Sequence, residues 1–253
     1  MAQLPFKPKQ VTKRILSPLQ DRAFDVILNR FGLGDDVERK TLEAIGEKYG
    51  ITRERVRQIE NAALASIRKA DSYKAEKVVF DELTKIVKDL GAIVEEEELL
   101  NHITKEKSAQ NHIHFYLVLG DEFKKEREDE HFKTRWIDDE ATSRHVHDAL
   151  KRLYATLSDE ELIPESELID RFLEELREVA DHYRNEEIAR RWLKLSKAMS
   201  SNPLGEWGKA DSQNVKTRGI KDYAYLVMRK HGSPMHFRQV AKAIEETFRK
   251  KTQ

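Results

Sequence analysis

The 253-residue chain contains no cysteine, which excludes disulfide bonds and thiolate metal sites and fits a reducing cytoplasm. It has no apolar run near the ~20 residues that a membrane-spanning helix requires, and no secretory leader opens it. Only 10 glycines and 6 prolines interrupt a sequence rich in Glu, Lys, Arg and Leu. We therefore expect a mainly α, cytoplasmic protein that does not associate with a membrane.

Sequence signatures of catalysis are also lacking. There is no phosphate-binding loop, no dinucleotide-binding glycine pattern and no His-Glu-x-x-His zinc motif. His112 and His114, like His145 and His147, are two residues apart and would point in different directions on a helix. We expect them to be solvated or locally hydrogen-bonded. The acidic run 95–98 fits a first helical turn better than a cation site, so we predict no enzyme activity, no metal and no cofactor.

Charge is distributed unevenly along a chain whose net charge is zero. Residues 1–74 hold 15 Lys or Arg against 10 Asp or Glu, and residues 216–253 hold 10 against 3. Between them, residues 75–140 hold 10 against 18 and residues 141–215 hold 11 against 15. Basic ends around an acidic middle indicate that different parts of the chain meet different partners.

The basic N-terminal part predicts a flexible tail over residues 1–14 and a domain over 15–70. Its first helix is expected to begin at Ser17 and Pro18 and to end at Gly32.

A helix-turn-helix motif is predicted next. Thr41 is the expected N-cap of a helix that Gly50 ends, and Thr52 is the expected N-cap of the following helix. Gly46 lies where a close crossing by that second helix would leave no room for a side chain. The buried stripe of the second helix is predicted to be Val56, Ile59, Ala63 and Ile67.

The first turns of this second helix carry Arg53, Glu54, Arg57 and Gln58, all off the apolar stripe. In a helix-turn-helix these turns enter the major groove of DNA. Arginine can pair with guanine, glutamine with adenine, and glutamate can accept from cytosine, whereas a carboxylate contributes nothing to phosphate binding. Glu54 therefore favours base reading. The alternative is a solvated helix face.

The stretch RAFDVILNRFGLGDDVERKTLEAIGEKYGITRERVRQIENAALASIRK resembles region 4 of bacterial primary sigma factors, which recognises the promoter element near −35. The resemblance implies a double-stranded DNA partner, with base edges touched by Arg53, Glu54, Arg57 and Gln58. It implies phosphate contacts from five further residues, some through helix N-terminal amides. These are Thr41, Leu42, Glu43, Thr52 and Arg55.

The resemblance also implies contact with RNA polymerase, at the flap of its β subunit, through Phe24, Ile27 and Leu28. Core packing is the alternative role for these three side chains. Only 16 residues precede Ser17, which leaves no space for the sigma region that melts the −10 element. We therefore expect a nucleoid-associated bacterial transcription factor that is not a complete sigma factor.

An internal repeat occupies the rest of the chain. VEEEELLNHI and IPESELIDRF match at their apolar positions with an offset of 69, and MHFRQVAKAI continues the pattern 72 residues later. An amphipathic helix precedes each copy, and a further helix and a candidate hairpin with Trp136 or Trp207 follow the first two. This order is typical of a winged helix and predicts modules at 75–140 and 141–215, with an incomplete third at 216–253.

The third copy resembles the HARE-type helix-turn-helix found in delta subunits of some bacterial RNA polymerases. Its cations, with others at 249–251, form a possible second DNA surface or a solvated basic face. The four that we single out are Arg229, Lys230, Arg238 and Lys242.

Phosphates repel acidic surfaces, so the modules at 75–140 and 141–215 favour protein contact or a spacer role over DNA binding. The function that we expect is sequence-specific reading of a −35-like element together with RNA polymerase contact. The alternative is a delta-like, polymerase-associated interaction module with weak or no specific DNA binding.

Overall fold

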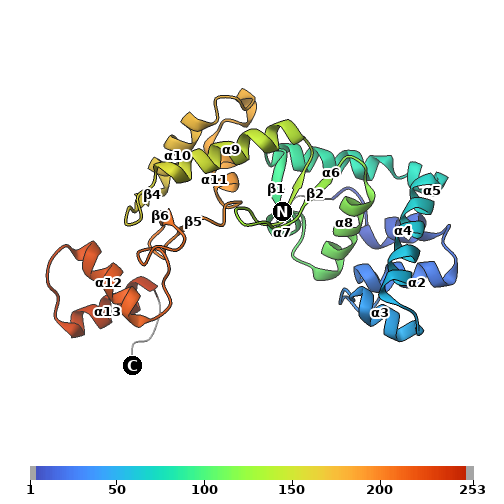
Figure 1. Cartoon of the computed structure of the whole chain (residues 1–253), viewed down its shortest axis with the longest axis horizontal. Coiled ribbons are helices and arrows are strands. Elements are labelled where there is room, and N and C mark those ends of the chain that lie inside the picture. Colours follow the sequence, from blue (N-terminus) through green and yellow to red (C-terminus); the bar gives the residue numbers. More distant parts are fainter. Residues whose placement is uncertain (1–3, 249–253) are drawn as a thin grey trace. The chain divides into compact units, whose positions relative to one another are not determined.

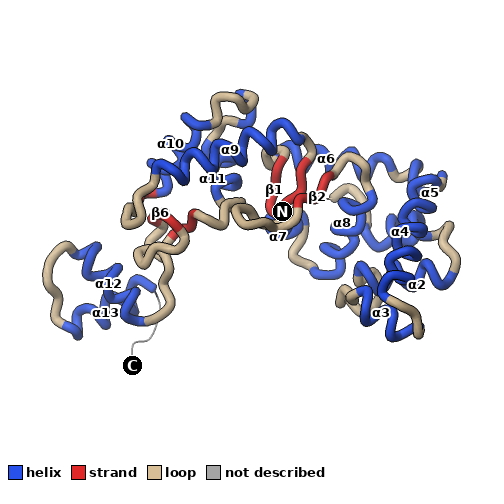
Figure 2. Tube along the Cα trace, viewed as in Figure 1, coloured by secondary structure: helices blue, strands red, loops and turns tan. Residues whose placement is uncertain are grey.

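The computed structural model describes residues 4–248, which form two compact units (Figure 1). Unit 1 contains the chain up to Glu126 together with Arg135–Asp138, and unit 2 contains Arg127–Thr134 and the chain from Asp139 onward. Helices dominate and the strands are short (Figure 2), which confirms the predicted mainly α class. The cations expected at 249–251 lie outside the described residues.

Unit 1 begins with five helices. They are α1 (Pro8–Leu16), α2 (Asp21–Phe31), α3 (Leu42–Tyr49), α4 (Arg53–Lys69) and α5 (Asp71–Lys74). The prediction of a flexible tail over 1–14 is wrong from Pro8 onward, because Val11 and Ile15 form an apolar stripe that is fully buried. Ser17 is the C-cap of α1 and does not start α2, which begins after Gln20.

The second half of unit 1 has the predicted order of helix, strand, two helices and hairpin. Its elements are α6 (Lys77–Asp89), β1 (Ile93–Glu95), α7 (Glu96–Ile103), α8 (Lys107–Leu119), β2 (Lys124–Glu126) and β3 (Arg135–Ile137). The strands form an antiparallel sheet in the order β1-β3-β2. Three glutamates of the acidic run lie in the first turn of α7, as predicted.

Unit 2 repeats this order. The elements that repeat it are α9 (Glu140–Thr156), β4 (Ile163–Pro164), α10 (Glu165–Glu175), a 3-10 turn (Asp181–Tyr183), α11 (Glu186–Leu193), β5 (Met199–Ser201) and β6 (Glu206–Lys209). The sheet order is β4-β6-β5. Val94 pairs with Trp136 in the first sheet, and Ile163 pairs with Trp207 at the corresponding place in the second. The two copies of the sequence repeat therefore pair their strands in the same register.

Helix α8 is the centre of the unit 1 core. Its residues 111 to 117 are all buried, and it packs against α1, α2 and α7. Phe31 of α2 meets Phe115 of α8 with ring centroids 5.1 Å apart. A single hydrophobic core thus joins the helix-turn-helix to the first repeat, although the sequence predicted separate domains.

A buried chain of hydrogen bonds ties α1 to α8. The carbonyl of Pro8 can only accept, so the Tyr116 hydroxyl donates to it over 2.5 Å. Tyr116 then accepts from the Thr12 hydroxyl, and Thr12 accepts from Nδ1 of His112, each over 2.8 Å. Burial lowers the pKa of His112 to about 4, which keeps the ring neutral. The expectation of solvated or locally bonded histidines is wrong here.

The hairpin loop of the first repeat, Arg127–Thr134, packs within unit 2. The ring of Phe132 stacks on His147 of α9 with centroids 4.2 Å apart. The Lys133 amide donates to the Leu195 carbonyl over 3.0 Å, and the Lys197 amide donates to the His131 carbonyl over 2.7 Å. The wing of the first repeat is therefore a packing element of the second.

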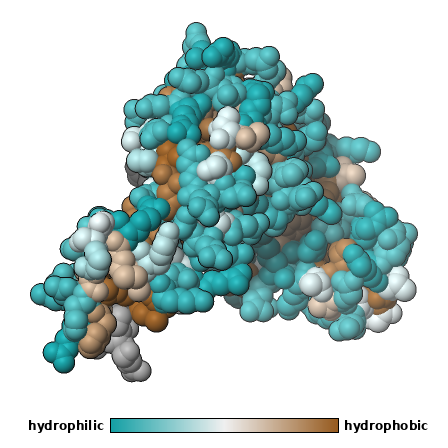
Figure 3. All heavy atoms as spheres, turned by 60° about the vertical axis from the view of Figure 1, so that its left-hand side comes forward, coloured by the Kyte–Doolittle hydropathy of each residue, from teal (hydrophilic) through white to brown (hydrophobic). Residues whose placement is uncertain are grey.

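The third copy comprises α12 (Ile220–His231) and α13 (Phe237–Phe248), with a small core around Tyr223, Val227, Val240 and Ile244. Hydrophobic side chains show at the surface of this lobe, at the lower left of Figure 3. Among the side chains of the third copy, Phe237 is 70% exposed. Within residues 4–248, no helix is long and apolar enough to cross a membrane.

Candidate nucleic-acid interface

Local interactions form the helix-turn-helix of α3 and α4, as predicted. The Thr41 hydroxyl accepts from the Ala44 amide, and the Thr52 hydroxyl accepts from the Arg55 amide, both over 3.2 Å. Gly50, with φ of 63°, ends α3 in the left-handed conformation that glycine adopts without strain. Both predicted N-caps and the predicted stop are confirmed.

A separate small core holds the two helices together. Val26 of α2, Ile45 of α3 and Val56 of α4 are completely buried, and Ile59 packs against them. A Cβ at Gly46 would lie 2.6 Å from the Ile51 carbonyl oxygen. The turn between the helices thus requires the glycine, and the sequence-based prediction that the crossing helix requires it is corrected.

The four predicted base-reading side chains lie together at the exposed N-terminal end of α4. Arg57 donates two hydrogen bonds to the Glu54 carboxylate, over 2.7 and 2.8 Å. A nitrogen of Arg53 lies 3.0 Å from the Glu43 carboxylate, and Arg55 donates to Gln58 over 3.1 Å. Both members of the Arg57 and Glu54 pair are more than half exposed, so a duplex can reach them.

Hydrogen bonding from Arg57 lowers the pKa of Glu54, and the same pair raises the pKa of Arg57. Both groups are therefore charged near neutral pH. The carboxylate also fixes the direction of the guanidinium, because a two-bond pair constrains the plane as well as the distance. Base reading by Arg57 would start from an oriented side chain.

The five predicted phosphate contacts lie at the starts of α3 and α4. The first amides of α3, at Leu42 and Glu43, have no intrahelical acceptor by helix geometry and carry the positive end of the helix dipole. Thr41, Thr52 and Arg55 are exposed beside them. The Glu43 carboxylate faces Arg53, which reduces its repulsion of a phosphate.

The three residues predicted to contact polymerase lie on α2. Ile27 is fully buried in the unit 1 core, and Phe24 and Leu28 are half-buried against it. In this conformation Ile27 is unavailable to a partner, so that part of the prediction is wrong and core packing is its role. The Ile27 side chain is buried because α2 packs on α8.

The cations of the third copy do not form a uniform basic surface. A carboxylate oxygen of Glu206 on β6 accepts a hydrogen bond from Arg229 over 2.5 Å. Lys242 lies 3.6 Å from Glu246 on the same helix. Lys230 and Arg238 are exposed on different helices. Arg229 is thus largely neutralised by its partner in unit 2.

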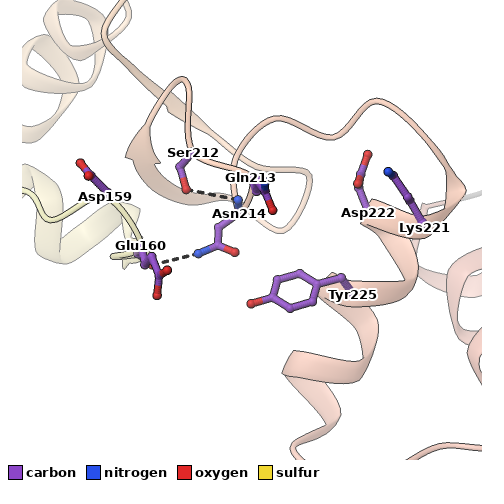
Figure 4. Close-up of a pocket in the computed structure, with 8 residues that line it drawn as sticks. All are labelled: Asp159, Glu160, Ser212, Gln213, Asn214, Lys221, Asp222 and Tyr225. Carbon is purple, nitrogen blue, oxygen red and sulfur yellow. Dashed lines mark hydrogen bonds between the residues drawn. The ribbon is translucent and has the colours of Figure 1, made fainter.

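A polar cavity of about 650 Å³ lies in unit 2 (Figure 4). Asn214 donates to the Glu160 carbonyl over 3.0 Å, and Tyr225 of α12 points toward the same space. Asp159, Glu160 and Asp222 outnumber Lys221 among the charged residues of its lining. Within residues 4–248, no group of three His, Asp or Glu side chains is placed to hold a metal ion.

The part of the chain that contains the helix-turn-helix is similar to a known protein family. Residues 15–69 match the family Sigma-70, region 4. Two curated relatives, both named RNA polymerase sigma factor RpoD, come from Helicobacter pylori strains 26695 and J99. Each is 47% identical over 60 residues, which are 24% of this chain and 9% of the relative. The chain thus covers only a small part of each relative.

Sequence reasoning missed two residues beside the region 4 domain. Asn111 of α8 is fully buried, and Arg39, in the loop between α2 and α3, donates to it over 2.8 Å. An asparagine at the start of the run NHIHFYLVL, in which only two histidines are also polar, was the available signal.

Proposed function

We propose that this chain is a bacterial transcription factor that reads a −35-like promoter element through α3 and α4. Arg53, Glu54, Arg57 and Gln58 touch base edges in the major groove. The start of α3, with Thr52 and Arg55, holds the flanking phosphates.

The observation that carries this proposal is the placement of those four side chains. They project from the first turns of α4, whose other face packs on a small hydrophobic core that contains Val56. A rigid helix with an exposed polar end suits groove insertion. The two N-caps also place two sets of helix-terminal amides beside that end, where phosphates would lie.

Selection of binding sites from random duplexes tests this proposal. A recovered motif with −35-like character supports it. Arg57→Ala or Glu54→Ala should then weaken binding roughly ten- to a hundredfold, mainly at one base position, whereas Arg55→Ala should weaken all duplexes alike. Selection without any motif would contradict base reading.

RNA polymerase is the partner that we propose beside DNA, because both relatives are named as polymerase sigma factors. The flap contact would use Phe24 and Leu28, which are half-buried on α2, and not the fully buried Ile27. A delta-like role without specific DNA binding is the second candidate, favoured by the acidic middle of the chain. Polymerase capture that survives the Arg53→Ala, Arg57→Ala double substitution, together with no selected motif, would favour that role.

A further inference from the structure

The loop from Gly32 to Lys40 connects α2 to α3, and the position of its last residues determines where the N-terminus of α3 lies. Its first part is held within the region 4 domain, because the Leu33 amide donates to the Leu28 carbonyl over 3.0 Å. At its end the Lys40 amide donates to Asn29, and Arg30 donates to the Lys40 carbonyl.

The side chain of Asn111, on α8 of the first repeat, reaches this loop from outside the region 4 domain. Its amide nitrogen donates to the carbonyl oxygens of Gly32 and Val37, over 3.0 and 2.7 Å. Its amide oxygen accepts from Nε of Arg39 over 2.8 Å. One buried side chain thus fixes the beginning, the middle and the end of the loop.

Gly32 gives independent support for this close fit. A Cβ there would lie 2.6 Å from the Val37 carbonyl oxygen and 2.7 Å from the Asn111 amide nitrogen. Its φ of +62° is also strained for any other residue type. The loop, the glycine and Asn111 therefore fit together without space for another atom. Arg39 is two residues from Thr41, the N-cap of α3.

We infer that Asn111 is a positioning residue for DNA binding. Through the Gly32 to Lys40 loop, Asn111 holds the N-terminus of α3 where the first amides of that helix meet the DNA backbone. The first repeat would then be part of the DNA-reading apparatus without touching DNA. This inference rests on the proposed function. Loss of Asn111 should weaken phosphate contacts and leave the preference among bases unchanged, since the proposed base-reading side chains lie on α4.

The test compares full-length wild type, Asn111→Ala and the control Tyr116→Phe on a selected duplex and on single-base variants of it, across a salt series. Tyr116 is also on α8 and buried, but it bonds to Thr12 and Pro8 and not to the loop. Asn111→Ala should bind every duplex roughly tenfold more weakly, with base preference kept and the salt slope reduced by about one. Tyr116→Phe should bind as wild type does.

Amide hydrogen exchange supplies a readout that does not depend on DNA. Asn111→Ala should speed exchange at the Leu33 and Lys40 amides, and Tyr116→Phe should not. Should Asn111→Ala fail to fold, Asn111→Ser and Arg39→Gln test the same bonds with smaller changes. Equal binding by Asn111→Ala and wild type, or a loss confined to one base position, would overturn the inference. If wild type itself showed no base preference, the proposed function would fail, and the exchange comparison would still decide whether Asn111 holds the loop.

Discussion

The Glu54 carboxylate and the Arg57 guanidinium form a two-bond ion pair on the exposed end of α4, one helical turn apart. Free protein therefore presents a matched pair instead of two independent charges. DNA binding must either keep this pair, with Glu54 orienting Arg57, or exchange it for bonds to bases.

The pair predicts non-additive effects on DNA affinity. If Glu54 orients Arg57, Glu54→Ala should already remove much of the benefit of Arg57, and the double substitution should cost less than the sum of the single ones. Affinities of the four proteins for one selected duplex give the coupling. Full additivity would mean that the two side chains act on DNA separately.

The turn between α3 and α4 predicts that Gly46→Ala lowers the free energy of unfolding of unit 1 by about 1–3 kcal/mol, because the new methyl group would collide with the Ile51 carbonyl. Gly34→Ala is the matched control, since a Cβ there would meet nothing within 4 Å. Urea unfolding measures both. A Gly46→Ala protein as stable as Gly34→Ala would show that the turn can move aside.

The buried His112 predicts loss of stability in acid. Its folded pKa of about 4 lies below the value of about 6.5 for an unfolded histidine, so the unfolded chain takes up a proton first as the pH falls. This contribution is fully present above pH 6.5 and is lost toward pH 4, by on the order of 2 kcal/mol between pH 6.5 and 5. Burial also lowers the pKa of His114, to about 2, in the same direction.

Hydrogen exchange of α8 amides at several pH values measures this loss. His112→Gln should make the dependence between pH 6.5 and 5 less steep, with the part due to His114 remaining, and the exposed His236→Gln should leave it unchanged. An unaltered slope in His112→Gln would assign the acid sensitivity to other groups.

The third copy predicts different effects for neighbouring cations if it forms a second DNA surface. Lys230→Ala should reduce the salt slope of non-specific DNA binding by up to about one. Arg229→Ala should change it little, because Glu206 already holds that guanidinium. Equal slopes for wild type and Lys230→Ala would assign this face to solvent.

Features that depend on near neighbours could be predicted from the sequence. The caps at Thr41 and Thr52 need only an amide three residues ahead, and the stop at Gly50 needs only the conformational freedom of glycine. The repeat could be predicted because equal apolar spacing gave equal strand register at Trp136 and Trp207.

Features that depend on distant partners could not be predicted. The sequence predicted a flexible tail in place of α1, because the short apolar stripe of this helix packs on α8, about a hundred residues later in the chain. Ile27 could have faced a partner or a core, and only the packing of α2 on α8 decides between them. Asn111 gave a faint signal, but its three bonds to a loop more than 70 residues away carry no sequence pattern.

Because Arg127–Thr134 belongs to unit 2, it limits where the chain can be cut to express either unit alone. The chain leaves unit 1 after β2 and returns for β3, the middle strand of the β1-β3-β2 sheet. A fragment that stops at Glu126 would lack the central strand of the sheet and the Trp136 side chain of the unit 1 core. A fragment extended through Asp138 would keep Phe132 but expose its ring, because His147 of α9 would be missing. Expression trials on shortened versions should therefore pair the longer cut with Phe132→Ser, since no single scission respects both units.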